Sequence, residues 1–156
     1  MKKPWWTAVV IVALLSAVGG WAASASLKEI VVVRAEATPA WSQRLTLVDE
    51  AVASNNVSRA IYEWREAYGA AMGSRRAEAL ASVGDAALRI DALAGSRGVF
   101  RAEARDAYQG SMLLAHAQRD VRTMLRAADS LAQLGDTRAA ERARQMARGL
   151  ARREAS

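Results

Sequence analysis

The sequence predicts an all-α domain of about six helices in three antiparallel hairpins, after an N-terminal hydrophobic helix. The chain has no proline after Pro39, and proline is the residue that most strongly breaks a helix. The residues that follow are rich in Ala, Arg, Leu and Glu, which all have high helix propensity. Apolar side chains recur there at three- and four-residue steps, the spacing of one face of a helix.

The N-terminal segment, residues 1–25, predicts export from the cytoplasm. Two lysines precede an uncharged apolar run from Trp5 to Ala25, as in a signal peptide or an N-terminal anchor. Small residues at Ala23 and Ala25 suit a signal peptidase, so cleavage after Ala25 is one interpretation. A transmembrane helix is the other, because ~30 Å of hydrocarbon takes about 20 apolar residues and tryptophans stand near both ends of the run.

Both interpretations place the remainder of the chain on the extracytoplasmic, periplasmic face of the membrane. The lysines precede the apolar run and the charges after it are balanced, so the positive-inside rule keeps the N-terminus in the cytoplasm. Residues 26–40 are expected to form a linker and residues 41–156 the helical domain. If uncleaved, residues 5–25 hold the domain at the membrane.

The first hairpin is predicted from one break and one amphipathic stripe. A helix begins at Trp41 and runs to about Ala53, where Asn55 and Asn56 break it, since asparagine favours caps and turns. The second helix covers about 57–72. Its apolar stripe consists of Val57, Ala60, Ile61, Trp64, Ala67, Tyr68 and Ala71.

Glycine-containing turns delimit the remaining helices. Gly73-Ser74 is expected to end the second helix and cap a third, about 74–93. Residues 94–98 form the clearest loop, and Gly135-Asp136 predicts a tight turn in which glycine ends one helix and aspartate caps the next. The last three helices are expected at about 99–117, 120–134 and 137–153.

Two short echoes suggest an internal repeat. Residues 65–68 return as 105–108, and residues 80–85 return as 131–136. The second helix of each hairpin also begins at intervals of roughly 40 residues, which is typical of stacked helical hairpins. Chance echoes in a chain rich in Ala and Arg are the alternative explanation.

The chain resembles the tetratricopeptide family at its small and aromatic motif positions. The matching residues are Ala128, Gly135, Ala140 and Ala147, together with Asn55, Ala60, Trp64 and Ala67. The pattern departs from the family in three ways: Arg144 stands at an aromatic position, the units exceed the usual length of about 34 residues, and the closing prolines are missing. The resemblance implies a tetratricopeptide-like solenoid and a scaffold that binds a protein or peptide in a concave groove.

The sequence offers no catalytic constellation, so we expect no enzyme activity, no cofactor and no metal. There is no cysteine, and His116 is the only histidine, whereas a metal site needs several ligands. Glu63 and Glu66 stand near Arg59 and Arg65, which favours ion pairing over acid–base chemistry. Gly84-Asp85 is expected to form a cap, like Gly135-Asp136.

Two surface features are candidates for partner binding. Tyr62 lies off the apolar stripe and is expected to be an exposed aromatic residue lining a groove. A basic stripe on the last helix is the second candidate and contains Arg138, Arg142, Arg148 and Arg152. We therefore expect a protein-interaction scaffold or, alternatively, a binder of anionic membrane surface or envelope polymer through this stripe. The charge of +6 would also suit nucleic acid, but export argues against it.

Overall fold

The computed structural model describes residues 38–95 and 98–154, all within one compact unit, Glu36–Ser156. The predicted signal or anchor segment and most of the predicted linker lie outside the described residues. None of the described helices is long and apolar enough to cross a membrane.

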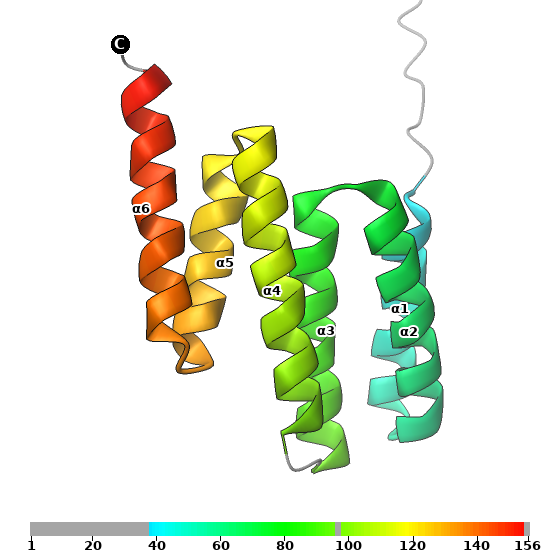
Figure 1. The fold of residues 1–156 in the computed structure, drawn as a ribbon. Helices are drawn as coiled ribbons and strands as arrows, with labels where there is room; N and C mark the ends of the chain where they lie inside the picture. Colours follow the sequence, from blue (N-terminus) through cyan, green and yellow to red (C-terminus); the bar gives the residue numbers. More distant parts are fainter. Residues whose placement is uncertain (1–37, 96–97, 155–156) are drawn as a thin grey trace, which may run out of the picture. The chain divides into compact units, whose positions relative to one another are not determined.

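The described chain is all-α and contains no strand, as the sequence predicts (Figure 1). Each observed helix corresponds to a predicted one, and the largest difference in a boundary is at the start of α3. The helices are α1 (Ala40–Ala53), α2 (Val57–Ser74), α3 (Ala77–Ala94), α4 (Val99–Gln118), α5 (Val121–Gln133) and α6 (Thr137–Glu154).

Consecutive helices are antiparallel neighbours (Figure 1). Three further pairs also pack, namely α1 with α3, α3 with α5, and α4 with α6. By contrast, α2 and α4 make no close backbone approach, although both pack against α3. Contact between α2 and α4 is therefore made by side chains alone, such as Trp64 and Phe100.

Polar side chains cap three of the helices. The side chain of Asn56 accepts a hydrogen bond from the Arg59 N–H (3.0 Å) at the start of α2. Asp120 does the same for Thr123 (2.9 Å) at the start of α5. Asp136 accepts from the Ala139 N–H (3.2 Å) in α6. These bonds satisfy backbone donors that have no partner within the helix.

The turn between α2 and α3 lies later than the sequence predicts. Ser74 remains in α2, where its hydroxyl donates to the Ala71 carbonyl (2.7 Å), and α3 begins only at Ala77. The residue that ends α2 is Arg75, in the left-handed conformation with φ 52°. The expectation that Ser74 opens the third helix is therefore wrong: its hydroxyl donates into α2 and accepts the Arg76 N–H (3.2 Å) in the turn before α3.

Alanine supplies most of the buried positions, and larger buried side chains are spread over all six helices. Trp64 is 6% exposed, and its indole Nε1–H donates to the Val83 carbonyl (3.0 Å) on α3. Its ring meets Phe100 of α4 edge-on, with 5.6 Å between ring centroids. The prediction that Trp64 packs in the core is confirmed.

Gly84 and Asp85 do not form a cap, contrary to the prediction, but lie in the interior of α3. A Cβ atom on Gly84 would stand 2.6 Å from Cε1 of Tyr108, so the missing side chain admits the tyrosine ring of α4. The Tyr108 hydroxyl donates to Asp85 (2.6 Å), whose other oxygen pairs with Arg126 of α5. Burial and the bond to Asp85 raise the pKa of Tyr108.

Glu63 is buried between α1 and α2, and its partner is not the one suggested by sequence proximity. Its carboxylate pairs with Arg44 of α1 at 2.8 Å, and this hydrogen bond raises the pKa of Arg44. Arg59 instead pairs with Glu50 at 3.6 Å. Glu63 therefore pairs with an arginine, as predicted, but with one on another helix, because α1 packs on the face that carries Glu63.

Candidate interaction surfaces

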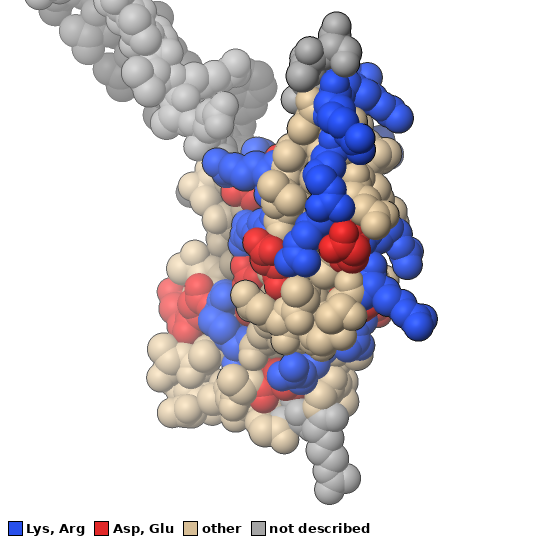
Figure 2. Space-filling view, turned by 90° about the vertical axis from the view of Figure 1, so that its left-hand side faces the viewer, with Lys and Arg blue, Asp and Glu red and all other residues tan. Residues whose placement is uncertain are grey.

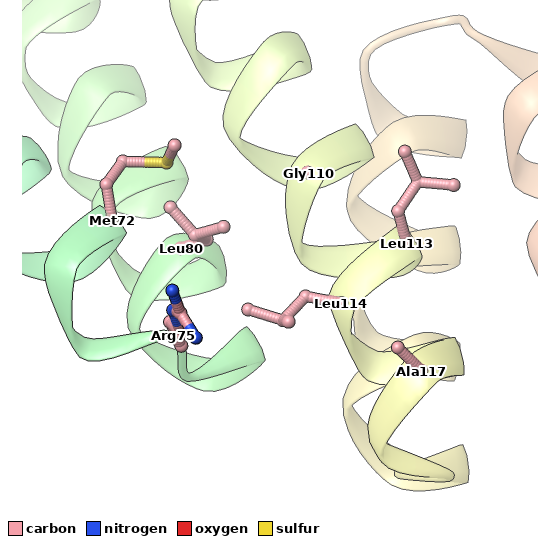
Figure 3. A pocket seen from close by; sticks show the side chains of 7 residues that line it. All are labelled: Met72, Arg75, Leu80, Gly110, Leu113, Leu114 and Ala117. Carbon is pink, nitrogen blue, oxygen red and sulfur yellow. The ribbon is translucent and has the colours of Figure 1, made fainter.

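An open apolar groove of about 490 Å³ lies between α2 and α4, above the start of α3 (Figure 3). Seven residues line it: Met72, Arg75, Leu80, Gly110, Leu113, Leu114 and Ala117. We refer to these residues as the α2–α4 groove.

The groove exists because its two walls stay apart and its interior residues are small. Gly110 has no side chain, and Ala117 has only a methyl group. Figure 3 shows Leu80 of α3 and Leu114 of α4 pointing toward each other across the floor. The space between α2 and α4 is thus bounded by apolar side chains but is not filled by them.

Two large apolar side chains on the rim of the groove are exposed to solvent. Met72 on α2 is 53% exposed, and Leu113 on α4 is 61% exposed. Single exposed apolar residues are common on protein surfaces, whereas these two border one concave surface with an apolar lining. A cleft of this kind is a candidate for partner binding.

Arg75 occupies the end of the groove where α2 and α4 terminate. Its carbonyl accepts a hydrogen bond from the side chain of Gln118 (2.5 Å), whose oxygen accepts from the Ala77 N–H (3.4 Å). Gln118 thereby fixes the α2–α3 turn against the end of α4. The Arg75 guanidinium lies between the two walls and forms no ion pair with any described residue.

This end of the groove is basic. Arg119 ends α4 in the same left-handed conformation as Arg75, with φ 57°. Arg76 reaches an acid, Glu78, only at 4.0 Å. The carboxylate of Asp120 is engaged in capping, and its hydrogen bonds with Thr123 lower its pKa. Glu78 and Asp120 therefore offset only part of the positive charge of the three arginines, and Arg75 has no ion pair with any described residue.

Tyr62 is exposed on α2 but does not line the α2–α4 groove. It lies nearly three helical turns before Met72. Tyr62, the aromatic residue that the sequence suggested for a groove, therefore lies away from the α2–α4 groove.

The basic stripe of the last helix lies on the exposed face of α6, and Figure 2 shows the basic side chains along this face. Arg148 pairs with Glu141 at 3.0 Å, and Arg152 donates to the Arg148 carbonyl (3.4 Å). Arg138 and Arg142 form no ion pair with the described residues. The opposite face of α6 is buried and consists of Ala139, Ala140, Ala143, Ala147 and Leu150.

Sequence patterns do not single out the α2–α4 groove, although one signal was available. Met112, Leu113 and Leu114 are consecutive apolar residues on one helix, and at about 100° per residue they cover more than one face. Met112 is buried, so Leu113 has to point elsewhere. Such a run marks an apolar position that the helix cannot bury within its own domain.

The described residues contain no group of three or more His, Cys, Asp or Glu side chains that could hold a metal ion. His116 is exposed near the end of α4. The chemical features that the described surface does offer are an apolar groove, a basic end to that groove and a basic helix.

These features belong to an all-α domain of antiparallel helices. Comparison of the chain with known protein families, with curated proteins and with solved structures finds no match.

Proposed function

We propose that the chain is an exported or membrane-tethered, tetratricopeptide-like scaffold that binds another protein and has no catalytic activity of its own. The observation that carries this proposal is the α2–α4 groove. Met72 and Leu113 remain exposed on its rim, while the same domain buries other large side chains such as Trp64 and Tyr108. A partner that covered the rim would remove this apolar surface from water.

The helix packing supports the tetratricopeptide-like part of the proposal. Helices α1, α3 and α5 are the first members of the three hairpins, and each packs on the next, as in a stacked array. Ala128, Ala140 and Ala147, which match small-residue positions of the motif, are buried. The turn residue Gly135 adopts φ 83°, which glycine accommodates without steric cost.

The localisation rests on the N-terminal sequence. Residues 5–25 either hold the domain at the outer face of the membrane or direct its export and are removed. A tethered scaffold would concentrate its partner at the membrane surface.

Site-specific photocrosslinking in the producing cells tests the proposal. A photoreactive residue is placed at exposed positions over the whole domain, including Tyr62, Leu113, Leu125 and Arg142. We expect one discrete protein adduct from a contiguous subset of positions. Absence of a light-dependent adduct at every position would contradict a scaffold function, and the intact mass of the same protein distinguishes an anchor from a cleaved signal.

The alternative is a binder of anionic membrane surface or envelope polymer through α6. The observation in its favour is the exposed stripe, in which Arg138 and Arg142 form no ion pair with the described residues. This alternative predicts flotation with anionic vesicles that weakens steeply with salt. Substituting both arginines by glutamine should weaken it further. Absent or salt-insensitive binding would eliminate this alternative.

A further inference from the structure

We infer that the α2–α4 groove receives an amphipathic helix of the partner protein, whose acidic residues meet Arg75 and Arg119 at the basic end. The inference rests on the proposed scaffold function and specifies the chemistry of its partner. Apolar side chains of the helix would cover Leu80 and Leu114 and contact the exposed rim residues.

The shape of the groove favours a helix over a small molecule. The backbones of its two walls, α2 and α4, stay apart, and its floor is a third helix, so the opening lies at the surface. Small-molecule sites bury about 70–90% of the ligand, which an open groove does not do. An amphipathic helix needs only its apolar face buried and leaves its polar face in water.

The positive charge at the Arg75 end of the groove indicates that the partner carries negative charge there. Arg75 has no ion pair within the described part of the chain, and it stands where the groove ends. Arg119 lies at the corresponding end of α4, and the side chain of Gln118 ties the two turns together. A carboxylate of the partner would meet the Arg75 guanidinium there, with Arg119 nearby at the end of α4, a pairing that steers association and disfavours basic partners.

The backbone at these two arginines gives a second reason to assign them a role. Both have positive φ, a conformation that glycine adopts at helix ends without the steric cost paid by other residues. Cations at a helix C-terminus are also favoured by the helix dipole. The test therefore has to separate a contribution to folding from a contribution to binding.

The binding test uses the purified full-length chain and three fluorescent helical peptides. The first has leucines at i, i+3, i+4 and i+7 followed by two glutamates, the second has lysines in place of the glutamates, and the third is a shuffled sequence. Fluorescence anisotropy should show the acidic peptide binding at least about tenfold more tightly than the lysine peptide, as expected for opposite against like charge at the same site. Salt should reduce this difference.

Paired variants locate the site. Leu113→Glu should weaken binding of the acidic peptide about tenfold or more, because it places a charge in the apolar contact. The matched control is Leu125→Glu on α5, at a leucine that is 42% exposed and lies outside the groove. This control should leave affinity unchanged.

Arg75→Gly separates the two roles of the arginine. Glycine suits the left-handed backbone, so the unfolding midpoint should stay the same or rise, while affinity for the acidic peptide falls about fivefold or more through loss of the charge. If Arg75 served only the fold, affinity for the acidic peptide would be unaltered whatever happened to the midpoint.

Three results would overturn the inference: no binding of the acidic peptide, equal binding of the lysine peptide, or equal effects of Leu113→Glu and Leu125→Glu. The cellular crosslinking experiment distinguishes failure of this inference from failure of the scaffold proposal. If cellular crosslinks to a discrete partner persist in the Leu113→Glu variant, the chain is a scaffold that uses another surface. If no position crosslinks, the scaffold function itself is wrong.

Discussion

At the scale of single residues, Trp64 joins three helices through one side chain. Its ring is almost fully buried, its Nε1–H bonds to the Val83 carbonyl, and it contacts Phe100. We expect Trp64→Ala to lower the free energy of unfolding by about 3–5 kcal/mol, as for other buried large aromatic residues. Urea unfolding followed by circular dichroism measures this change, and near-wild-type stability would contradict the packing.

Gly84 provides a second prediction for a single residue, in which the direction of the change in stability is informative. Alanine normally stabilises a helix relative to glycine by roughly 0.5–1 kcal/mol. At Gly84, however, the new Cβ would stand 2.6 Å from the Tyr108 ring, which is buried and held by Asp85. We expect Gly84→Ala to destabilise the domain by about 1–3 kcal/mol through overpacking.

Gly69 of α2 is the matched control, because nothing lies within 4 Å of the position that its Cβ would occupy. Gly69→Ala should therefore raise the unfolding midpoint, while Gly84→Ala lowers it. If both substitutions were stabilising, the close approach of Tyr108 to α3 would be incorrect.

At the scale of helices, Asp120 shows how one carboxylate fixes the start of α5. It accepts the Thr123 N–H, and this bonding lowers its pKa below the usual 3.8. A lowered folded-state pKa means that the stabilisation is fully present above the unfolded pKa and is lost as pH falls through the folded pKa. We expect Asp120→Ala to cost about 0.5–2 kcal/mol at neutral pH.

The variant Asp120→Asn isolates the pH dependence, because asparagine also caps a helix but does not titrate. Unfolding free energies of wild type and variant, measured from pH 7 down to the acidic range, should converge as the pH falls below the folded pKa of Asp120. A constant difference over the whole range would show that the charge of Asp120 contributes nothing.

The helices themselves were largely predictable from the sequence, and the exceptions have physical causes. Asn56 and Asp136 mark true helix starts, because each side chain bonds a backbone N–H at the start of the following helix. The dipeptide Gly84-Asp85 has the same composition as Gly135-Asp136 but serves the contact with Tyr108 in the middle of α3. The echo between 80–85 and 131–136 therefore falls on structurally different positions.

The α2–α4 groove, unlike the helices, was not predictable from the sequence, because it depends on how the helices pack against one another. The run Met112–Leu114 signals that one of these residues is left exposed, but the distance between α2 and α4, which forms the groove, is not encoded in any local pattern. Similarly, the partner of Glu63 is Arg44 on another helix rather than an arginine nearby in α2. Local sequence specified which residues form helices, and helix packing determined which surfaces remain open.

At the scale of the whole molecule, α6 is the last described helix and packs on α5 and α4. A helix that packs on its neighbours through one face carries polar residues on the face that meets water. Helix α6 has this form, with a buried alanine face and exposed arginines. The basic stripe therefore has a structural explanation that requires no ligand.

This explanation predicts the effect of ending the chain after Gly135. Loss of α6 would expose the α5 surface that it covers, including Met124, Ala128 and Leu131, all of which are fully buried in the intact domain. We expect the truncated chain to form soluble aggregates in size-exclusion chromatography and to unfold at lower temperature, because newly exposed apolar surface favours association. The full-length double variant Arg138→Gln/Arg142→Gln is the control, since it keeps the helix and removes charge. It should migrate as the wild type does, so aggregation of this control would mean that charge, rather than coverage of α5 by α6, keeps the domain soluble.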